Sequence, residues 1–439
     1  MKNPVVLALF AVVGLMLAGI GQARAQQGLS INIVNGTESA IPITVVPFAN
    51  NNAGLPPSTH VAQVIHDDLA RCGKFRVLDN GDLVAFPHVG SDIKFAAWKL
   101  LKQDYIVVGH IADAGGGAFK VDFELWDVNA KQQLLSQSFT AEPGKLRGVA
   151  HQIADAIYQK IIGVPGAFYT RIAYVTATGV APHISYSLIV ADSDGYNPQV
   201  VVHSREDLMS PTWSPNGQEL AYVSFESGNS AIYIQNLATG ARRLVSGRKG
   251  INGAPAFSPD GKTLAVSLSF QGNPEIYLID LATGKLTRLT HNYAIDTEPQ
   301  WMPDGKDIVF TSDRAGKPQL YEIPVTGGTP QRLTFQGAYN SNSSISYDGK
   351  QIAMVQGNGN VYRIAVMDLG LNGQEHFVAP GNLDENPSFA PNGSMLVYAA
   401  IEGTYSVLYE VSADGKVRQR LMLAHGSVRS PAWGPYSSH

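Results

Sequence analysis

Short runs of alternating apolar and polar residues dominate the chain from residue 171 onward. Runs such as Leu220–Val223 and Ile232–Ile234 are typical of β-strands that place one face in a core. Gly, Asn and Asp separate the runs and suit tight turns, as in Ala238–Gly240. Four such runs recur in each successive segment, which predicts a series of sheets with four short strands each.

A turn sequence marks each segment at a constant spacing. The first copy, Trp-Ser-Pro-Asn-Gly at 213–217, suits a type I turn in which Pro presets φ and Gly takes the last corner. An aromatic or aliphatic residue precedes each turn as an inward anchor. The six anchors are spaced by 44 residues at Trp213, Phe257, Trp301, Ile345, Phe389 and Trp433. A period of about 40–50 residues is typical of propeller blades.

The two ends of this array predict how it closes. A second-strand run, Arg171–Val175, has no turn copy before it, and Trp433 has no strands after it. Residues 429–434 therefore supply the strand missing from the blade begun by 171–203. The expected fold is a six-bladed β-propeller closed by the C-terminal strand, which leaves no free sheet edge between the first and last blades.

A different pattern precedes the propeller. Apolar runs that read as strands alternate with helical spacing, as in Val61, Val64, Ile65 and Leu69, and Gly73 provides a helix stop. This predicts a small α/β domain. Its expected strands are 41–48, 75–78, 105–111, 119–128 and 134–140, and its expected helices are 59–72, 93–101 and 147–162. The predicted divisions are a signal peptide at 1–25, an N-terminal segment at 26–40, the α/β domain at 41–163, a linker at 164–170 and the propeller at 171–439.

The first 25 residues read as a secretory signal. Lys2 is followed by an apolar run, Val5–Ile20, and an A-x-A cleavage site, Ala23–Ala25. A membrane helix is the alternative, but the run is short for a span. Cleavage leaves 30 basic and 36 acidic residues, a net charge of −6, which argues against bulk nucleic-acid binding. Cys72 is the only cysteine, so no intrachain disulfide forms.

The segment after the signal supports two interpretations. Residues 26–40 are polar and rich in Gly, Asn and Ser, as in a frayed terminus. Within them, Leu29–Val34 alternates and can add as a strand to a sheet of the same chain or of a partner.

No motif in the chain demands a reaction. Gly-x-Ser-x-Gly, His-Glu-x-x-His and paired Cys-x-x-Cys are absent. Asp260, Asp304 and Asp348 lie in turns, where Asp serves the backbone. The loops that lead into each innermost strand instead gather polar residues at one channel mouth, which makes this ring the default binding site. Its carboxylates suit a hard cation such as Ca²⁺ as a further alternative, although no cofactor is expected.

These features together resemble the TolB family, the periplasmic propeller proteins of the Tol-Pal envelope system. The most specific stretches are 41–48, 166–175, 194–197, 225–228, 252–261, 297–299 and 311–313. The combination of the linker, the leading domain and the repeated turn is more specific than the turn alone.

The resemblance implies two protein partners and no enzymatic activity. Pal, a peptidoglycan-associated lipoprotein, would bind the channel mouth, and TolA would bind residues 26–37. The system would support outer-membrane integrity and constriction at cell division, and group A colicins would exploit it. The candidate TolA contacts are Gln26, Gln27, Leu29, Ile31, Ile33 and Val34. The candidate Pal contacts are Met209, Ser210, Asn252, Gly253, Ala254, Asp296, Thr297, Glu298, Asn340, Asn342, Asp384, Glu385 and Arg429.

Two departures from the family and two rival functions accompany this prediction. Ile251 stands where the family often has His, and the N-terminal segment is less acidic than is typical. An exported hydrolase predicts a nucleophile or metal cluster at the mouth. A glycan-binding propeller predicts aromatic platforms there, for which Tyr293 and Tyr339 are the nearby candidates.

Overall fold

The computed structural model describes residues 31–33, 40–51, 57–370, 373–421, 423 and 426–437. The described residues belong to one compact unit that begins at Ile31. The expected signal peptide and most of the segment 26–40 lie outside them. Within the described ranges, none of the helices has the length and hydrophobicity needed to cross a bilayer.

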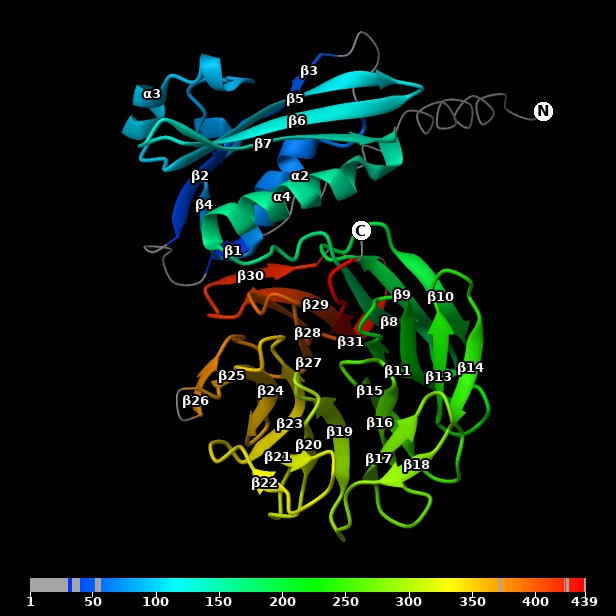
Figure 1. Cartoon of the computed structure of the whole chain (residues 1–439). Helices are drawn as coiled ribbons and strands as arrows, with labels where there is room; N and C mark the ends of the chain where they lie inside the picture. Colours follow the sequence, from blue (N-terminus) through cyan, green and yellow to red (C-terminus); the bar gives the residue numbers. More distant parts are fainter. Residues whose placement is uncertain are drawn as a thin grey trace, which may run out of the picture. The chain divides into compact units, whose positions relative to one another are not determined.

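The first domain is a mixed sheet with helices, as the sequence predicts (Figure 1). Its strand order is β4-β2-β5-β6-β7, with β2 parallel to β4 and β5, and with β5, β6 and β7 antiparallel. The strands are β2 (Ile41–Val45), β3 (Ala49–Asn50), β4 (Phe75–Val77), β5 (Tyr105–Gly115), β6 (Ala118–Asp127) and β7 (Gln132–Ala141). The α-helices are α2 (Val61–Arg71), α3 (Phe95–Leu100) and α4 (Leu146–Ile162), and the 3₁₀ turns are Asn80–Asp82, Gly90–Asp92 and Pro143–Lys145.

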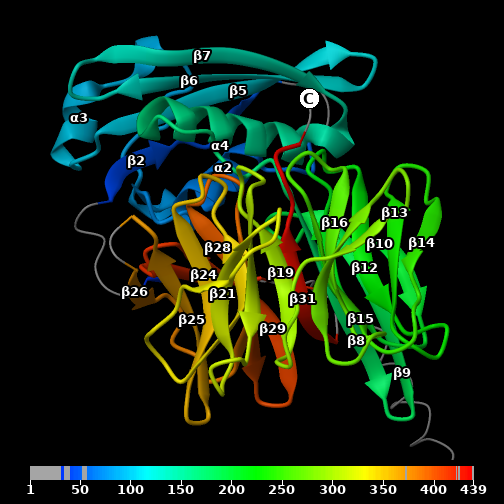
Figure 2. The same ribbon diagram turned by 60° about the horizontal axis from the view of Figure 1, so that its bottom comes forward.

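Two amphipathic helices cover one face of this sheet (Figure 2). The predicted apolar positions of α2 are all buried. Burial of each such side chain stabilises the folded state by about 1.5–3 kcal/mol. Gly163 ends α4 in the left-handed conformation, with φ of 90°, where glycine has no Cβ to clash. The same hydrophobic cluster continues into the second domain through Met395, Val397 and Trp433.

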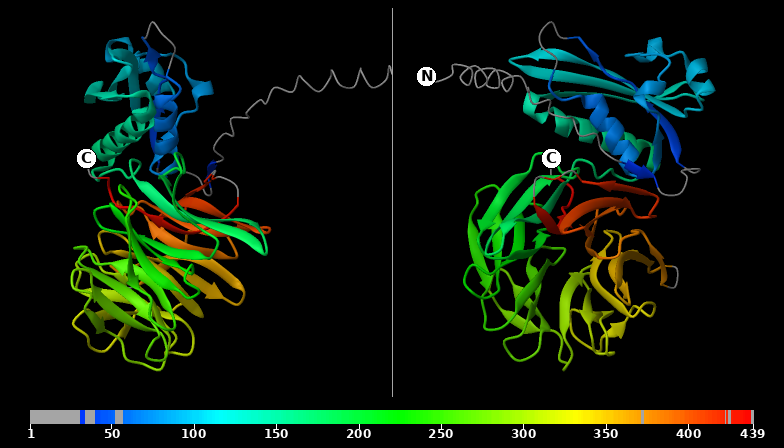
Figure 3. Two further views of the ribbon diagram at one scale, coloured as in Figure 1. Left: turned by 90° about the vertical axis from the view of Figure 1, so that its right-hand side faces the viewer. Right: turned by 180° about the vertical axis from the view of Figure 1, so that it is seen from behind.

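The second domain is a six-bladed propeller within the described residues (Figure 3). Each blade is an antiparallel sheet, and in four of the blades the strands follow one another along the chain. The blades with an unbroken strand order are β11 (Leu208–Trp213), β12 (Glu219–Ser224), β13 (Ala231–Asn236) and β14 (Arg242–Ser246); β15 (Asn252–Phe257), β16 (Thr263–Leu268), β17 (Glu275–Asp280) and β18 (Leu286–Arg288); β19 (Asp296–Trp301), β20 (Asp307–Ser312), β21 (Gln319–Pro324) and β22 (Gln331–Arg332); and β23 (Tyr339–Ile345), β24 (Gln351–Asn358), β25 (Val361–Asp368) and β26 (Gln374–Phe377).

The remaining two blades each join distant parts of the chain. One contains the C-terminal strand, and the other carries a fifth strand from the N-terminal segment. Their strands are β31 (Ser427–Trp433), β8 (Arg171–Val180), β9 (His183–Asp192) and β10 (Gln199–Ser204); and β27 (Asp384–Phe389), β28 (Met395–Glu402), β29 (Tyr405–Ser412), β30 (Val417–Arg420) and β1 (Ile31–Ile33).

The predicted closure is confirmed. Strand β31 pairs antiparallel with β8, placing Trp433 opposite Ile172. The indole Nε1 of Trp433 donates to Thr170 Oγ1 at 2.8 Å, and Trp213 Nε1 donates to the carbonyl of Ala432 at 3.0 Å. Strand β31 is therefore bonded both to Thr170, just before β8, and to Trp213 of the next blade.

The repeated turn has the conformation that its residues favour. In the first copy, the Gly217 N–H donates to the Ser214 carbonyl at 2.8 Å, and Gly217 has φ of 67°. The Ser214 hydroxyl donates to Asn216 Oδ1 and accepts from the Glu219 N–H. Ser therefore links the turn to the start of the second strand, which explains its recurrence.

Replacing Trp433 by Ala should destabilise the protein by about 3–5 kcal/mol, because it removes a buried indole and the bond that holds the closing strand. Urea unfolding measures the loss. Tyr405→Ala is the control, since this ring is 62 % exposed and its removal should change the free energy of unfolding by less than about 0.5 kcal/mol. Equal stability of the two variants would contradict closure by β31.

Candidate functional site

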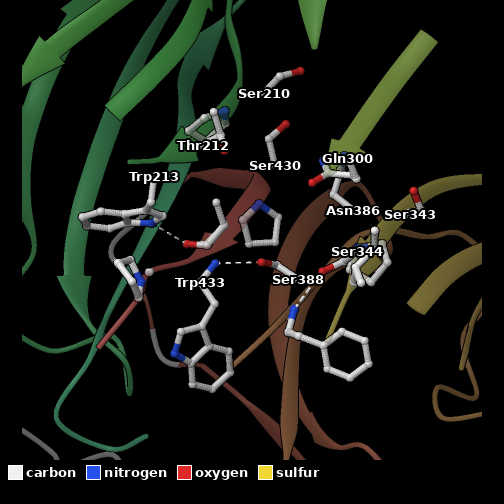
Figure 4. A pocket seen from close by; sticks show the side chains of 18 of the residues that line it. Ser210, Thr212, Trp213, Gln300, Ser343, Ser344, Asn386, Ser388, Ser430 and Trp433 are labelled. Atoms are coloured by element: carbon white, nitrogen blue, oxygen red, sulfur yellow. Dashed lines mark hydrogen bonds between the residues drawn. The ribbon is translucent and has the colours of Figure 1, made fainter. Parts of the chain in front are cut away.

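A channel runs between the innermost strands of the propeller. Its cavity of about 320 Å³ is lined by residues from all six first strands, from Ser210 through Ser430. Figure 4 shows Ser210, Asn386 and Ser430 among the side chains that line it. The lining is largely Ser, Asn, Pro and Trp, so the wall offers hydrogen-bonding groups and little net charge.

A bulge at the same position in every first strand shapes this wall. Each first strand shifts register there against its neighbour, as between Met209 and Thr212. The bulge residue has φ between 47° and 56°, a left-handed conformation that is uncommon for residues other than Gly. The six bulge residues all line the channel and are spaced by 44: Ser210, Ala254, Glu298, Asn342, Asn386 and Ser430.

Such strain, repeated six times around one cavity, is typical of a functional surface. Proline follows the bulge residue in five of the six strands, with Ser343 as the exception. Proline has no N–H, so its position in the bulge leaves no ladder donor unpaired. The X-Pro that precedes the anchor in five of the six strands is the sequence signal for this ring, although the ring was not predicted from it.

Glu298 is the only acidic member of the bulge ring. Its Oε2 accepts hydrogen bonds from Thr311 Oγ1 at 2.7 Å and from the Asn342 N–H at 2.8 Å. Asn386 Nδ2 in turn donates to Asn342 Oδ1 at 3.0 Å. Burial raises the pKa of Glu298, against the lowering effect of the Thr311 and Asn342 hydrogen bonds. The carboxylate therefore bonds a neighbouring strand of its own blade and the first strand of the next blade, and Asn342 continues the series to a third blade.

Four predicted contacts lie two residues before the bulge and are buried: Asn252, Asp296, Asn340 and Asp384. Asn252 accepts from Ser246 Oγ and donates to the Arg248 carbonyl. Asp296 accepts two bonds from Arg314, at 3.0 and 2.8 Å. These side chains hold the loops that enter the first strands. Their direct contact with a partner stays a prediction.

Asp384 differs from its three counterparts in its surroundings. Burial raises the pKa of its carboxyl to about 6, although Arg418, the Gly381 N–H and Arg363 act to lower it. The neighbouring Glu385 is exposed. The predicted acidic pair therefore splits into one buried and one accessible carboxylate.

The other predicted mouth residues are at least partly accessible. Met209, Gly253 and Thr297 are half-buried, and the hydroxyl of Thr297 accepts from Ser267 Oγ at 3.2 Å. Arg429 is also half-buried and forms an ion pair with Asp207. With Glu385, these residues are the predicted contacts that can meet a partner without rearrangement of the loops.

Exposed apolar residues accompany the polar ring in the same loops. Tyr293 is fully exposed, Phe335 is 74 % exposed and Ile251 is 51 % exposed, and Ile295 and Leu383 are also exposed. These residues precede the first strands β15, β19, β23 and β27. Tyr339, in contrast, packs edge-on against Tyr362. Exposed apolar side chains grouped at one end of a domain are typical of protein-binding surfaces, a role that was not predicted for these residues.

The N-terminal segment reaches the propeller as a strand. Strand β1 pairs antiparallel with β30, placing Ile31 opposite Gln419 and Ile33 opposite Val417. The strand interpretation is thus confirmed for residues 31–33. The other predicted partner contacts of this segment, Gln26, Gln27, Leu29 and Val34, lie outside the described residues.

Comparison with known proteins covers nearly the whole chain. A model of the TolB amino-terminal domain matches residues 29–134, and a model of the TolB beta propeller domain matches residues 158–437. The Tol-Pal system protein TolB of Xanthomonas campestris pv. campestris (strain B100) is 58 % identical over 437 residues, which is 99 % of each chain. The chain belongs to the TolB family.

Solved and curated TolB proteins agree with this assignment. The crystal structure of TolB from Acinetobacter baumannii is 40 % identical, covers 93 % of this chain and 100 % of its own, and superimposes with a TM-score of 0.85. TolB of Xanthomonas euvesicatoria pv. vesicatoria (strain 85-10) is 57 % identical over the same length. TolB is a non-enzymatic protein, so membership of the family supports binding and not catalysis.

In the described part of the channel lining, no group of acidic side chains is close enough to share a calcium ion. Among the described residues, three His, Cys, Asp or Glu side chains close enough to share one ion occur at Asp68, His151 and Asp194. None of these three residues lines the channel.

Replacing Glu298 by Ala should cost about 1–3 kcal/mol, because it leaves the Thr311 hydroxyl and the Asn342 N–H without their shared acceptor. The matched control is Glu385→Ala, since this exposed carboxylate has no such role. Urea unfolding compares the two variants. A loss below about 0.5 kcal/mol at residue 298 would show that the bulge ring does not depend on this carboxylate.

Proposed function

We propose that this chain is the periplasmic TolB adaptor of a Tol-Pal system. It binds the lipoprotein Pal at the channel mouth and binds TolA through residues 26–37. In this role it supports outer-membrane integrity and constriction during cell division, and group A colicins can exploit it. The full-length similarity to proteins named Tol-Pal system protein TolB is the observation that carries the proposal.

The mouth offers chemistry that fits a protein ligand. Its rim combines accessible polar groups, such as Thr297 and Glu385, with the exposed side chains of Ile251, Tyr293 and Phe335. Aromatic anchors within a polar rim are typical of the energetically dominant part of a protein interface. A loop of Pal inserted between them would bury apolar area and meet the hydrogen-bonding groups of the channel wall. Pal held in this way would be unavailable to peptidoglycan.

The N-terminal segment offers a second, separate site. Its strand β1 uses backbone pairing with β30, and the same backbone groups can pair with a strand of another protein. TolA would compete with β30 for this segment. Release of β1 would expose one edge of the blade that also contains the mouth residue Glu385. The two partners are thereby linked through one blade.

The double variant Tyr293→Ala with Phe335→Asp should weaken Pal binding at least tenfold, which corresponds to about 1.4 kcal/mol. Both side chains are exposed, so the fold should be unaffected. Isothermal titration of purified Pal measures the affinity, and Leu244→Ala is the control. Leu244 is exposed on the outer strand β14, away from the channel. Unchanged affinity of the double variant would remove this mouth from the Pal site.

Deleting residues 26–37 should abolish capture of TolA while leaving the melting temperature within a few degrees, because the described part of the segment adds three residues to an already complete blade. A variant with the same residues in scrambled order separates the effect of sequence from that of length. Pull-down with the soluble domain of TolA is the measurement. Full capture of TolA by the deletion variant would contradict the proposed site.

A further inference from the structure

Six ionisable side chains meet where the α/β domain contacts the propeller. We call this group the interdomain cluster. Three are carboxylates, two are guanidinium groups and one is an imidazole, and all but one are almost completely buried. The cluster consists of Asp68, Arg71, Arg147, His151, Asp194 and Glu410.

Helices α2 and α4 supply the part of the cluster that belongs to the α/β domain. Asp68 and Arg71 stand on α2, and the Arg71 Nε donates to Asp68 Oδ1 at 3.2 Å. Arg147 and His151 stand on α4, and His151 Nδ1 lies 2.6 Å from Asp68 Oδ2. Asp68 thus binds a cationic or proton-bearing group on each side, one from each helix.

The propeller supplies the opposing charges from two different blades. Glu410 on β29 accepts from Arg71 Nη1 at 2.6 Å, and Ser193 Oγ accepts from Arg71 Nη2 at 2.9 Å. Asp194, in the turn after β9, forms an ion pair with Arg147. The Nε2 atom of His151 lies 3.6 Å from Asp194 Oδ2. Arg71 of α2 therefore contacts both blades, whereas Arg147 and His151 of α4 contact Asp194 in one of them.

The charge balance of the cluster depends on one proton. When all three carboxylates are ionised, they face two permanent guanidinium charges, so a neutral His151 leaves one buried negative charge without a partner. An unpaired buried charge is strongly destabilising, whereas a paired cluster is tolerated. A proton on His151 makes the cluster neutral overall and lets both ring nitrogens donate, Nδ1 to Asp68 and Nε2 toward Asp194.

We propose that His151 is a proton-operated latch between the α/β domain and the propeller. With both ring nitrogens protonated, it bridges Asp68 of α2 and Asp194 of the propeller and holds the interface closed. Loss of one proton leaves these two carboxylates facing each other across a neutral ring, and the interface opens more readily. The latch does not depend on the proposed partners of the chain.

The surroundings of His151 agree with this assignment. Burial alone would lower the pKa of His151, but the charge and hydrogen bond of Asp68 and the charge of Asp194 raise it above its usual value, with Arg71 opposing them. Asp155 on α4, Asp192 on β9 and Arg147 complete the charged groups around the ring. Burial also raises the pKa of Glu410 to about 7, although Arg71 acts to lower it.

The direction of the pH effect follows from these shifts. A histidine whose pKa is raised in the closed state contributes stability that is fully present below its free value of about 6.5. That contribution to stability is lost as the pH rises through the higher pKa that His151 has in the closed state. Glu410 acts in the same direction, because its pKa is also raised in the closed state. The pKa of Asp194 is lowered, so its contribution is lost only in acid.

A metal ion is the rival explanation of the same residues. Asp68, His151 and Asp194 each place one potential ligand atom within 4.8 Å of the others. Two guanidinium groups already bind these carboxylates, however, and a divalent cation would add excess positive charge beside them. A proton on His151 lets the ring bind both Asp68 and Asp194 while adding only one positive charge.

The test compares the wild type with His151→Gln, whose side-chain amide can form hydrogen bonds but cannot carry the charge. Hydrogen exchange of the α2, α4 and β29 amides between pH 6 and 8.5, corrected for intrinsic rates, reports opening of the interface. We expect the opening equilibrium of the wild type to rise by up to about tenfold per pH unit above pH 6.5. His151→Gln should be more open at pH 6 and should lose most of this dependence. His203→Gln is the control, because His203 is exposed on β10.

A second measurement keeps the proposal open to contradiction if the variant is poorly folded. The ring of His151 in the wild type, labelled with ¹³C and followed by NMR, should remain protonated at pH 6.5. A ring that is neutral at that pH would overturn the proposal. An equal pH dependence of opening in wild type and His151→Gln would also overturn it, as would strengthening of the closed state by added Zn²⁺.

Discussion

The pairing of β31 with β8 is the interaction on which the rest of the molecule depends. It bonds residue 433 to residue 172 and converts an open series of sheets into a closed wheel. Only a closed wheel keeps six first strands at equal distances from one axis, and only then do six bulges face one channel. The same pairing places Trp433 in the hydrophobic cluster shared with the α/β domain. Closure of the wheel and docking of the first domain therefore rest on the same strand.

Strained residues line the channel, and closure of the propeller compensates for their cost in free energy. A left-handed residue costs about 1–2 kcal/mol, and six of them stand at equivalent positions in the described strands. Cross-blade bonds offset part of this cost, such as those from Asn342 to Glu298 and from Asn386 to Asn342. Buried residues two positions earlier, including Asn252 and Asp296, fix the loops that enter the strands. The rim that remains accessible is a mixture of polar groups and exposed aromatic rings.

Local chemistry determined which features could be predicted from the sequence. The turn at 213–217 and the helix stop at Gly73 depend on neighbouring residues alone, and both occur as predicted, with φ of 74° at Gly73. The bulge at Glu298 depends on strand register, which composition does not show, and the X-Pro that marks it was not recognised as a signal. Asp296 was predicted at the mouth, but Arg314 binds it inside the blade. Arg71 and Glu410 are 339 positions apart, and no sequence pattern indicates that they meet.

The central claim is that the open end of this closed wheel binds another protein. Hydrogen exchange of the chain with and without purified Pal tests it most directly. The account predicts protection of the loops before β15, β19, β23 and β27, with the outer strands β14 and β18 unchanged. Protection confined to the outer strands or to the α/β domain, with the mouth loops exchanging as in the free chain, would contradict it.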